Sequence, residues 1–286
     1  MIRKTECIAC TSNNIVFFGN KSGHSYHKCL ACGTLQLVPM PDSDAMKMAY
    51  EKNYAASGHC QALPEVRNLA ALPQFQAIAD MLVDYCSPEL VLDYGPGWGG
   101  LLKTLKERGI SAEGAELSEL MVTHCRTEGF TIHQADLTNM EGSSIYDAIV
   151  LSSVFEHLTD HVQWLSDAKR LLKHNGLVVS LQPTAHFASL LGTIFRFGIK
   201  SRELPQLHQV FWPPWHTVLF SIPGMCSLVE RQGFEMVDIR PAPLQREGGY
   251  TGILQRSLSI INQTATPFFG VKWPLWVGHI FAFRVK

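Results

Sequence analysis

Four cysteines near the start of the sequence have the spacing of a metal site. They form two pairs, Cys7-x2-Cys10 and Cys29-x2-Cys32, with 18 residues between the pairs. Each pair can offer two thiolates from one tight turn, so four sulfurs can surround one Zn²⁺ tetrahedrally. His24 and His27 lie close enough to replace a ligand, and four thiols without metal are the other alternative. A four-cysteine shell has no open coordination position, so the sequence predicts a structural zinc ion.

A glycine-rich turn further along the chain has the pattern of a cofactor site. Its sequence is Asp93-x-Gly95-x-Gly97-x-Gly99-Gly100, between a predicted strand and a predicted helix. Because glycine has no side chain, a ligand can approach the backbone closely at such a turn. Gly95, Gly97 and Gly100 also satisfy the dinucleotide fingerprint, so an enzyme that uses nicotinamide or flavin is an alternative.

Three carboxylates bear on whether the cofactor is a dinucleotide or one that carries a cationic amino-acid group. Asp93 stands two residues before Gly95, where it suits a cationic amino-acid group and would repel a pyrophosphate. Glu116 can accept hydrogen bonds from both hydroxyls of a ribose, which either cofactor contains. Asp136 can accept a hydrogen bond from the amino group of an adenine. Asp93 and Asp136 therefore argue against a dinucleotide.

The elements that position these residues alternate between strand and helix patterns. Strands are predicted at 90–93, 112–116, 130–134, 146–151 and 177–181, with helices between them; a helix at 224–232 and strands at 234–240 and 280–285 follow. This alternation predicts right-handed crossovers and a Rossmann-like, doubly wound α/β fold. We expect a mostly parallel seven-stranded sheet whose last strand is antiparallel, with ligands at the carboxyl ends of the strands.

The chain divides into three predicted parts. Residues 1–41 are a zinc-ribbon module that ends at Pro39-Met-Pro41, because these prolines force an extended backbone. Residues 42–74 are a helical connector. Residues 75–286 are the cofactor-binding domain, and an insertion at about 184–223 covers the acceptor site.

The end of the fourth predicted strand carries a family signature. Its sequence, Tyr146-Asp-Ala-Ile-Val-Leu-Ser-Ser-Val-Phe-Glu-His-Leu158, resembles that strand in class I S-adenosylmethionine-dependent methyltransferases of the small-molecule branch. The resemblance covers about residues 75–183 and Gly233-Phe234. The N-terminal part, with the cysteine pairs, Pro39-Met-Pro41 and Tyr50-x3-Tyr54, resembles the zinc-ribbon leader of bacterial methyltransferases that modify sugars or cell-surface polysaccharides.

This resemblance implies that the cofactor is S-adenosyl-L-methionine. By the same resemblance, Asp93, Gly95, Gly97 and Gly99 line the methionine part, Glu116 binds the ribose, Asp136 binds the adenine, Leu117 and Leu137 flank the adenine ring, and Ser152 approaches through its backbone. Trp98 departs from the small or polar residue common at this turn. If it points inward, it crowds the methionine end of the cofactor.

Methyl transfer from a sulfonium is an in-line displacement, so much of the rate can come from positioning the acceptor. His157 follows the fourth strand and is the candidate catalytic base; a histidine that only shapes the pocket is the alternative. We expect Glu156 to organise the loop or a helix start rather than to touch substrate. The insertion contains Leu207-His-Gln-Val-Phe-Trp-Pro-Pro-Trp-His-Thr-Val-Leu-Phe220, whose aromatic rings suit a sugar or a planar metabolite. A packing segment that its prolines interrupt is the alternative. His208 and His216 are further acid or base candidates.

Composition narrows the choice of partners. The chain has 24 Lys and Arg against 25 Asp and Glu, so no strong field attracts nucleic acid. The start lacks the pattern of a signal peptide, so we expect a cytoplasmic protein with reduced thiols. No apolar run is long enough to span a membrane. The aromatic tail at 266–283 is predicted to be buried or lid-like, with a weak membrane-surface contact as the alternative.

The sequence therefore predicts a methyltransferase that acts on a small molecule, most plausibly a sugar, a sugar nucleotide or a polysaccharide precursor. Two alternatives stay open. One is a non-catalytic binding protein that uses the cofactor fold as a scaffold. The other is a methyltransferase for protein or RNA, because zinc ribbons can dock macromolecules.

Overall fold

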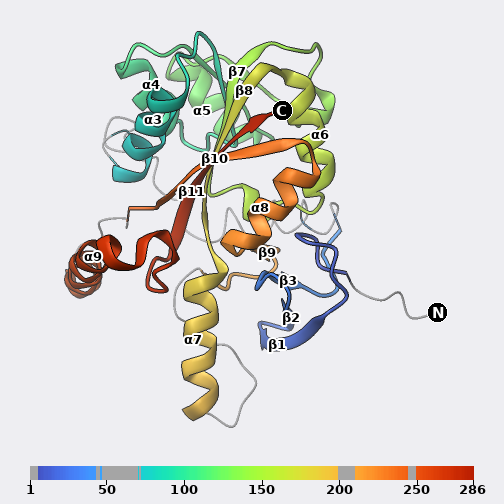
Figure 1. Cartoon of the computed structure of the whole chain (residues 1–286). Helices are drawn as coiled ribbons and strands as arrows, with labels where there is room; N and C mark the ends of the chain where they lie inside the picture. Colours follow the sequence, from blue (N-terminus) through green and yellow to red (C-terminus); the bar gives the residue numbers. More distant parts are fainter. Residues whose placement is uncertain (1–5, 43–45, 47–69, 71, 199–209, 244–248) are drawn as a thin grey trace.

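Two β-sheets organise the protein, a large central one and a small one near the N-terminus (Figure 1). The structure is a computed structural model and describes residues 6–42, 46, 70, 72–198, 210–243 and 249–286. Most of the predicted connector at 42–74 and His208 lie outside the described residues.

The large sheet has seven strands in the order β10-β11-β8-β7-β4-β5-β6. The strands are β4 (Val91–Tyr94), β5 (Ala112–Ala115), β6 (Ile132–His133), β7 (Tyr146–Ser152), β8 (Leu172–Pro183), β10 (Phe234–Pro241) and β11 (Gly278–Val285). β11 runs antiparallel to both of its neighbours, and the pairs from β8 to β6 are parallel. The predicted Rossmann-like fold with an antiparallel last strand is confirmed.

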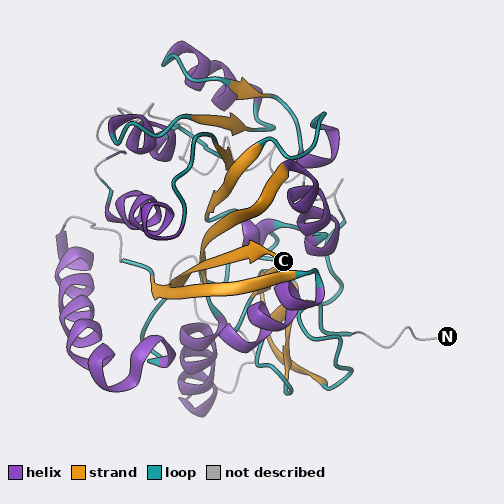
Figure 2. Ribbon diagram, turned by 45° about the horizontal axis from the view of Figure 1, so that its top comes forward, coloured by secondary structure: helices purple, strands orange, loops and turns teal. Residues whose placement is uncertain are grey.

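Helices cover both faces of this sheet (Figure 2). The described helices are α3 (Pro73–Tyr85), α4 (Gly100–Glu107), α5 (Glu119–Thr127), α6 (His161–Leu171), α7 (Ala185–Gly198), α8 (Ile222–Arg231) and α9 (Gly249–Phe269), with the short turns η2 (Leu137–Asn139), η3 (Phe155–His157) and η4 (Gly270–Lys272). The helix predicted at 224–232 starts at Ile222, because Ser221 caps it by accepting a hydrogen bond from the Gly224 amide. The third strand is shorter than predicted, since only Ile132 and His133 pair with β5.

Two hydrophobic cores lie against the two faces of the sheet. On one face, α3 and α4 pack Leu82 and Leu105 against Val91 of β4. On the other face, α6 and α8 contribute Leu165 and Leu228 to the second core. The strands between them are buried on both sides, which holds their carboxyl ends at fixed positions.

The small sheet has the order β1-β2-β3-β9, and its fourth strand comes from far along the chain. Its strands are β1 (Ile15–Lys21), β2 (His24–Cys29), β3 (Leu35–Leu37) and β9 (Val218–Leu219). β9 pairs with β3 through Leu35 and Leu219. Arg231 of α8 also donates hydrogen bonds to the carbonyls of Ile8 and Ala9. The cysteine-rich module is therefore joined both to β9 and to α8.

The C-terminal part divides into a helix and a strand. Phe268 and Phe269 at the end of α9 are exposed, whereas Trp276 is buried and β11 lies inside the large sheet. The predicted aromatic tail is thus buried only in its second half. Among the described residues, no helix combines the length and apolar character that a membrane span needs.

Candidate functional site

The glycine-rich turn connects β4 to α4. Gly95, Gly97 and Gly99 all have positive φ, at 74°, 55° and 80°, a region that side chains disfavour. A Cβ atom on Gly95 would lie 2.7 Å from Val154 Cγ2, in the loop after β7. A Cβ atom on Gly97 would meet nothing within 4 Å. The turn is therefore packed against the loop after β7 at Gly95 and is open at Gly97.

Asp93 is a buried carboxylate at the base of this turn. Its side chain is almost fully buried, and its Oδ2 atom has no hydrogen-bond partner. Burial, and to a lesser degree the charge of Glu116, raise the pKa of Asp93 well above its ordinary value. An unpartnered buried carboxylate is costly unless a cation or donor binds it. The site therefore fits a ligand with a positively charged amino group.

Glu116 and Asp136 lie at the carboxyl ends of β5 and β6. One oxygen of Glu116, Oε1, accepts hydrogen bonds from the Leu117 and Ser118 amides, both at 2.8 Å. Oδ1 of Asp136 accepts one from the Tyr94 hydroxyl at 3.0 Å and one from the Leu137 amide. Local hydrogen bonds thus hold both carboxylates at the same edge of the sheet as Asp93. The bond from Tyr94 was not predicted from the sequence.

The other predicted cofactor contacts differ in exposure. Leu117 is exposed, Leu137 is fully buried in the core, and Ser152 is half-buried at the end of β7. Trp98 packs edge-on against His124 of α5, with ring centroids 5.1 Å apart. Its ring therefore has a packing partner on α5.

A second cluster, Glu156, His157 and His216, lies just past β7. One potential ligand atom from each residue lies within 4.8 Å of the others. Glu156 is fully buried, neither carboxylate oxygen has a hydrogen-bond partner, and burial raises its pKa to about 8. Burial also lowers the pKa of His157 well below its usual value, with a further contribution from His216.

Glu156 was predicted to organise the loop or a helix start, and its side chain does not cap α6. The side chain of Asp160 caps α6 instead, accepting a hydrogen bond from the Gln163 amide at 2.9 Å. His216 joins the cluster because the next residue, Thr217, bonds to η3. The Thr217 amide donates to the Glu156 carbonyl at 2.8 Å, and its hydroxyl lies within hydrogen-bond distance of the same oxygen.

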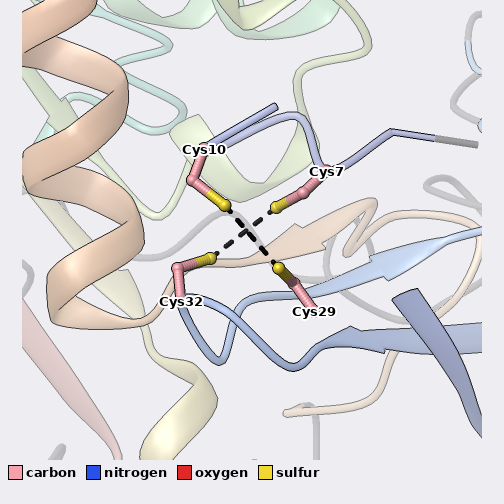
Figure 3. Close-up of side chains that lie close together, drawn as sticks. All are labelled: Cys7, Cys10, Cys29 and Cys32. Atoms are coloured by element: carbon pink, nitrogen blue, oxygen red, sulfur yellow. Dashed lines mark hydrogen bonds between the residues drawn. The ribbon is translucent and has the colours of Figure 1, made fainter. Parts of the chain in front are cut away.

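The four paired cysteines converge on one point (Figure 3). The Cys7 and Cys32 sulfurs are 3.7 Å apart, and the Cys10 and Cys29 sulfurs are 3.6 Å apart. At a Zn–S distance of about 2.3 Å, the corners of a tetrahedron lie about 3.8 Å apart. The donor set and its spacing therefore fit one tetrahedral zinc ion. In the described residues, His24 and His27 do not belong to this group.

The fold and these residues define a Rossmann-like cofactor enzyme, and comparison with known proteins gives its family. A family of methyltransferase domains matches residues 41–239, more than half of the chain, so the chain belongs to this family. It is a class I S-adenosylmethionine-dependent methyltransferase. It is also similar to an uncharacterized methyltransferase of Bacillus cytotoxicus, with 29% identity over 155 residues that cover 52% of this chain and 71% of that protein.

Solved structures share this fold at low sequence identity. The 1,6-didemethyltoxoflavin-N1-methyltransferase of Burkholderia thailandensis has a TM-score of 0.56 at 12% identity, covering 94% of this chain and 99% of that one. The magnesium protoporphyrin IX methyltransferase of Synechocystis has a TM-score of 0.55 at 14% identity, covering 85% and 100%. At these identities the likeness concerns the fold alone.

Proposed function

We propose that this enzyme methylates a small-molecule acceptor of the saccharide class, namely a sugar, a sugar nucleotide or a polysaccharide precursor. The observation that carries this proposal is a group of aromatic and imidazole rings just past β7. Trp212 is half-buried, and its ring centroid lies 5.9 Å from those of Trp215 and His216 and 6.5 Å from that of His157. Tryptophan faces beside polar groups suit a sugar ring or a planar metabolite.

The solved relatives support a small acceptor in general terms. The Burkholderia enzyme was solved with 1,6-didemethyltoxoflavin bound, and the Synechocystis enzyme is named for magnesium protoporphyrin IX. Both are small molecules with planar rings. The choice of a saccharide rests on the Trp212 group and on the N-terminal resemblance.

We propose that the acidic residues and the glycine turn hold S-adenosylmethionine, which supplies an electrophilic methyl group. Asp93 would bind its amino group, because that buried carboxylate has an unpartnered oxygen. Gly95, Gly97 and Gly99 would line the methionine part. Glu116 would bind the ribose, and Asp136 the adenine, with Leu117 and the Ser152 backbone beside the ring. Leu137 would contribute its backbone, because its side chain is fully buried.

We further propose that Cys7, Cys10, Cys29 and Cys32 hold a structural zinc ion. Two sulfur–sulfur distances of 3.7 and 3.6 Å, with all four sulfurs within 4.8 Å of one another, support this assignment. All four thiols would be used as ligands, so this ion would take no part in methyl transfer. Its role would be to fix the small sheet, and through β9 the segment that carries His216.

The test is formation of S-adenosylhomocysteine by the full chain with separate acceptor panels: nucleotide sugars, free saccharides, planar metabolites, RNA and protein. We expect product above the acceptor-free rate with a saccharide compound. Trp212→Ala should reduce turnover while cofactor binding, measured by calorimetry, is unchanged. Trp273→Ala is the matched control, because Trp273 stacks on Phe269 at the end of α9 and does not belong to the Trp212 group. Turnover with RNA or protein alone, or equal effects of the two tryptophan variants, would contradict the proposal.

A further inference from the structure

We propose that Glu156, His157 and His216 form a second metal site, which binds a divalent first-row transition metal and presents it to a hydroxyl oxygen of the acceptor. This inference rests on the proposed function and narrows it to an acceptor that is methylated on oxygen. Two imidazoles and one carboxylate are a donor set for such metals, and three protein ligands leave positions open for substrate.

The donor atoms of the three residues lie close enough for small side-chain movements to bring them onto one ion. His157 Nε2 is 3.9 Å from Glu156 Oε1, and the potential donors of all three residues lie within 4.8 Å of one another. In a tetrahedral site with bonds of about 2.0–2.2 Å, two donors lie about 3.4 Å apart. Side-chain rotations would have to shorten the His157–Glu156 separation by about 0.5 Å, and the other separations by at most about 1.4 Å, to reach this geometry.

The surroundings orient His216 as a ligand. Its Nδ1 atom is 2.9 Å from the Val210 carbonyl, and because a carbonyl oxygen only accepts, Nδ1 carries the proton. Nε2 therefore has its lone pair available. A carbonyl that fixes the ring and the tautomer in this way is a typical outer partner of a metal-binding histidine.

The backbone of this segment is held as well. The Tyr26 hydroxyl donates to the His216 carbonyl at 2.8 Å, and Thr217 donates to the carbonyl of Glu156. The first contact holds His216 on β2, and the second holds its segment beside Glu156. Such preorganisation is what a metal site requires of its scaffold.

The environment of Glu156 points to a bound ligand independently of the distances between the donors. It is 1% exposed, and both of its oxygens lack a hydrogen-bond partner. A protonated Glu156 would still leave its hydroxyl without an acceptor, so neutralisation alone does not satisfy it. A cation bound by both imidazoles would satisfy the charge and the lone pairs together.

The cluster adjoins the proposed cofactor turn. Val154, two residues before Glu156, is the residue that a side chain at Gly95 would strike. A metal-bound hydroxyl of the acceptor would lose its proton to solvent more readily than a free one. The resulting oxygen would form a bond to the methyl carbon while the carbon–sulfur bond breaks, and the electron pair would stay on sulfur. His157 would then act as a ligand instead of the general base predicted from the sequence.

The test is the zinc content of the full-length protein after equilibration with Zn²⁺ and removal of free metal. We expect about two ions per chain in the wild type and about one in Glu156→Gln or His216→Gln, because each substitution removes one of three ligands. Glu113→Gln is the matched control, since Glu113 pairs with one histidine, His133, at 2.8 Å and belongs to no cluster of metal ligands among the described residues. That variant should keep both ions.

The same zinc content in Glu156→Gln and His216→Gln as in the wild type and Glu113→Gln would overturn the second metal site. Two ligand variants are used so that the failure of one to fold leaves the other to decide, and Cys10→Ser, which should lose the ion of the cysteine cluster, tells the two sites apart. Cofactor binding by calorimetry separates this inference from the proposed function. Saturable binding and turnover, with a zinc content that neither ligand variant lowers, would refute only the metal site, whereas absence of cofactor binding would refute the proposed function.

Discussion

The charge of Asp93 provides a sharp test of the cofactor site. Asp93→Asn keeps the size of the side chain and removes its charge. The buried Oδ2 atom has no protein partner, so a bound ammonium group would be its main compensation. Losing one partner of a buried, hydrogen-bonded charge pair costs about 2–5 kcal/mol. We therefore expect S-adenosylhomocysteine to bind about 30- to 5,000-fold more weakly.

The pH dependence of binding gives a second prediction for Asp93. In the free protein, burial and Glu116 raise the pKa of Asp93, and a bound ammonium group would lower it. Binding then releases a proton where the pH lies between these two pKa values. The affinity should fall as the pH is lowered through that window, by at most about tenfold per pH unit. In Asp93→Asn this dependence should disappear.

Isothermal titration calorimetry with two ligands checks both points. 5′-Methylthioadenosine has the adenosine part but no amino-acid part, so it serves as the control ligand. Asp93→Asn should weaken S-adenosylhomocysteine and leave the control ligand unchanged. Equal losses for both ligands would show that the substitution damages the whole pocket, and no loss for either would refute the proposed contact.

Two further predictions concern the glycine turn and the cysteine cluster. Gly95→Ala adds strain of about 1–2 kcal/mol from its positive φ and about 1–3 kcal/mol from the contact with Val154, whereas Gly97→Ala adds only strain. Urea unfolding of the cofactor-free variants should show this difference, and equal losses would argue against the packing described at Gly95. Cys10→Ser should lose about one zinc ion per chain and lower Tm by about 2–4 °C for each kcal/mol lost. Cys86→Ser, outside the cluster, should do neither; identical melting of the two variants would contradict a structural zinc ion.

Short-range patterns in the sequence predicted much of this protein. The buried strands, the glycine turn and the acids at strand ends follow local rules, so the large sheet and the places of Asp93, Glu116 and Asp136 could be predicted. The spacing of the cysteines likewise predicted that their sulfurs would meet. The roles of these residues in binding a cofactor or a metal stay predictions.

Long-range contacts could not be predicted in the same way. A strand as short as β9 has no periodicity to detect, and nothing local indicates that it pairs with β3. The meeting of His216 with Glu156 depends on that path of the chain and on Thr217. Helix α7 was also missed, although Ala185–Gly198 is rich in apolar residues, because it follows Pro183 where the strand–helix alternation stops.

The pairing of β3 with β9 also sets an order of events during synthesis. Leu35 leaves the ribosome about 180 residues before its partner Leu219, which at typical elongation rates is a delay of about 10–40 s. During that time the edge of β3 has no fourth strand, and an uncovered edge can pair with other chains. Early capture of a metal by the cysteines would hold this edge in a small, ordered hairpin until β9 arrives. Zinc supply during translation should therefore affect the yield of soluble protein more than zinc added to the finished chain.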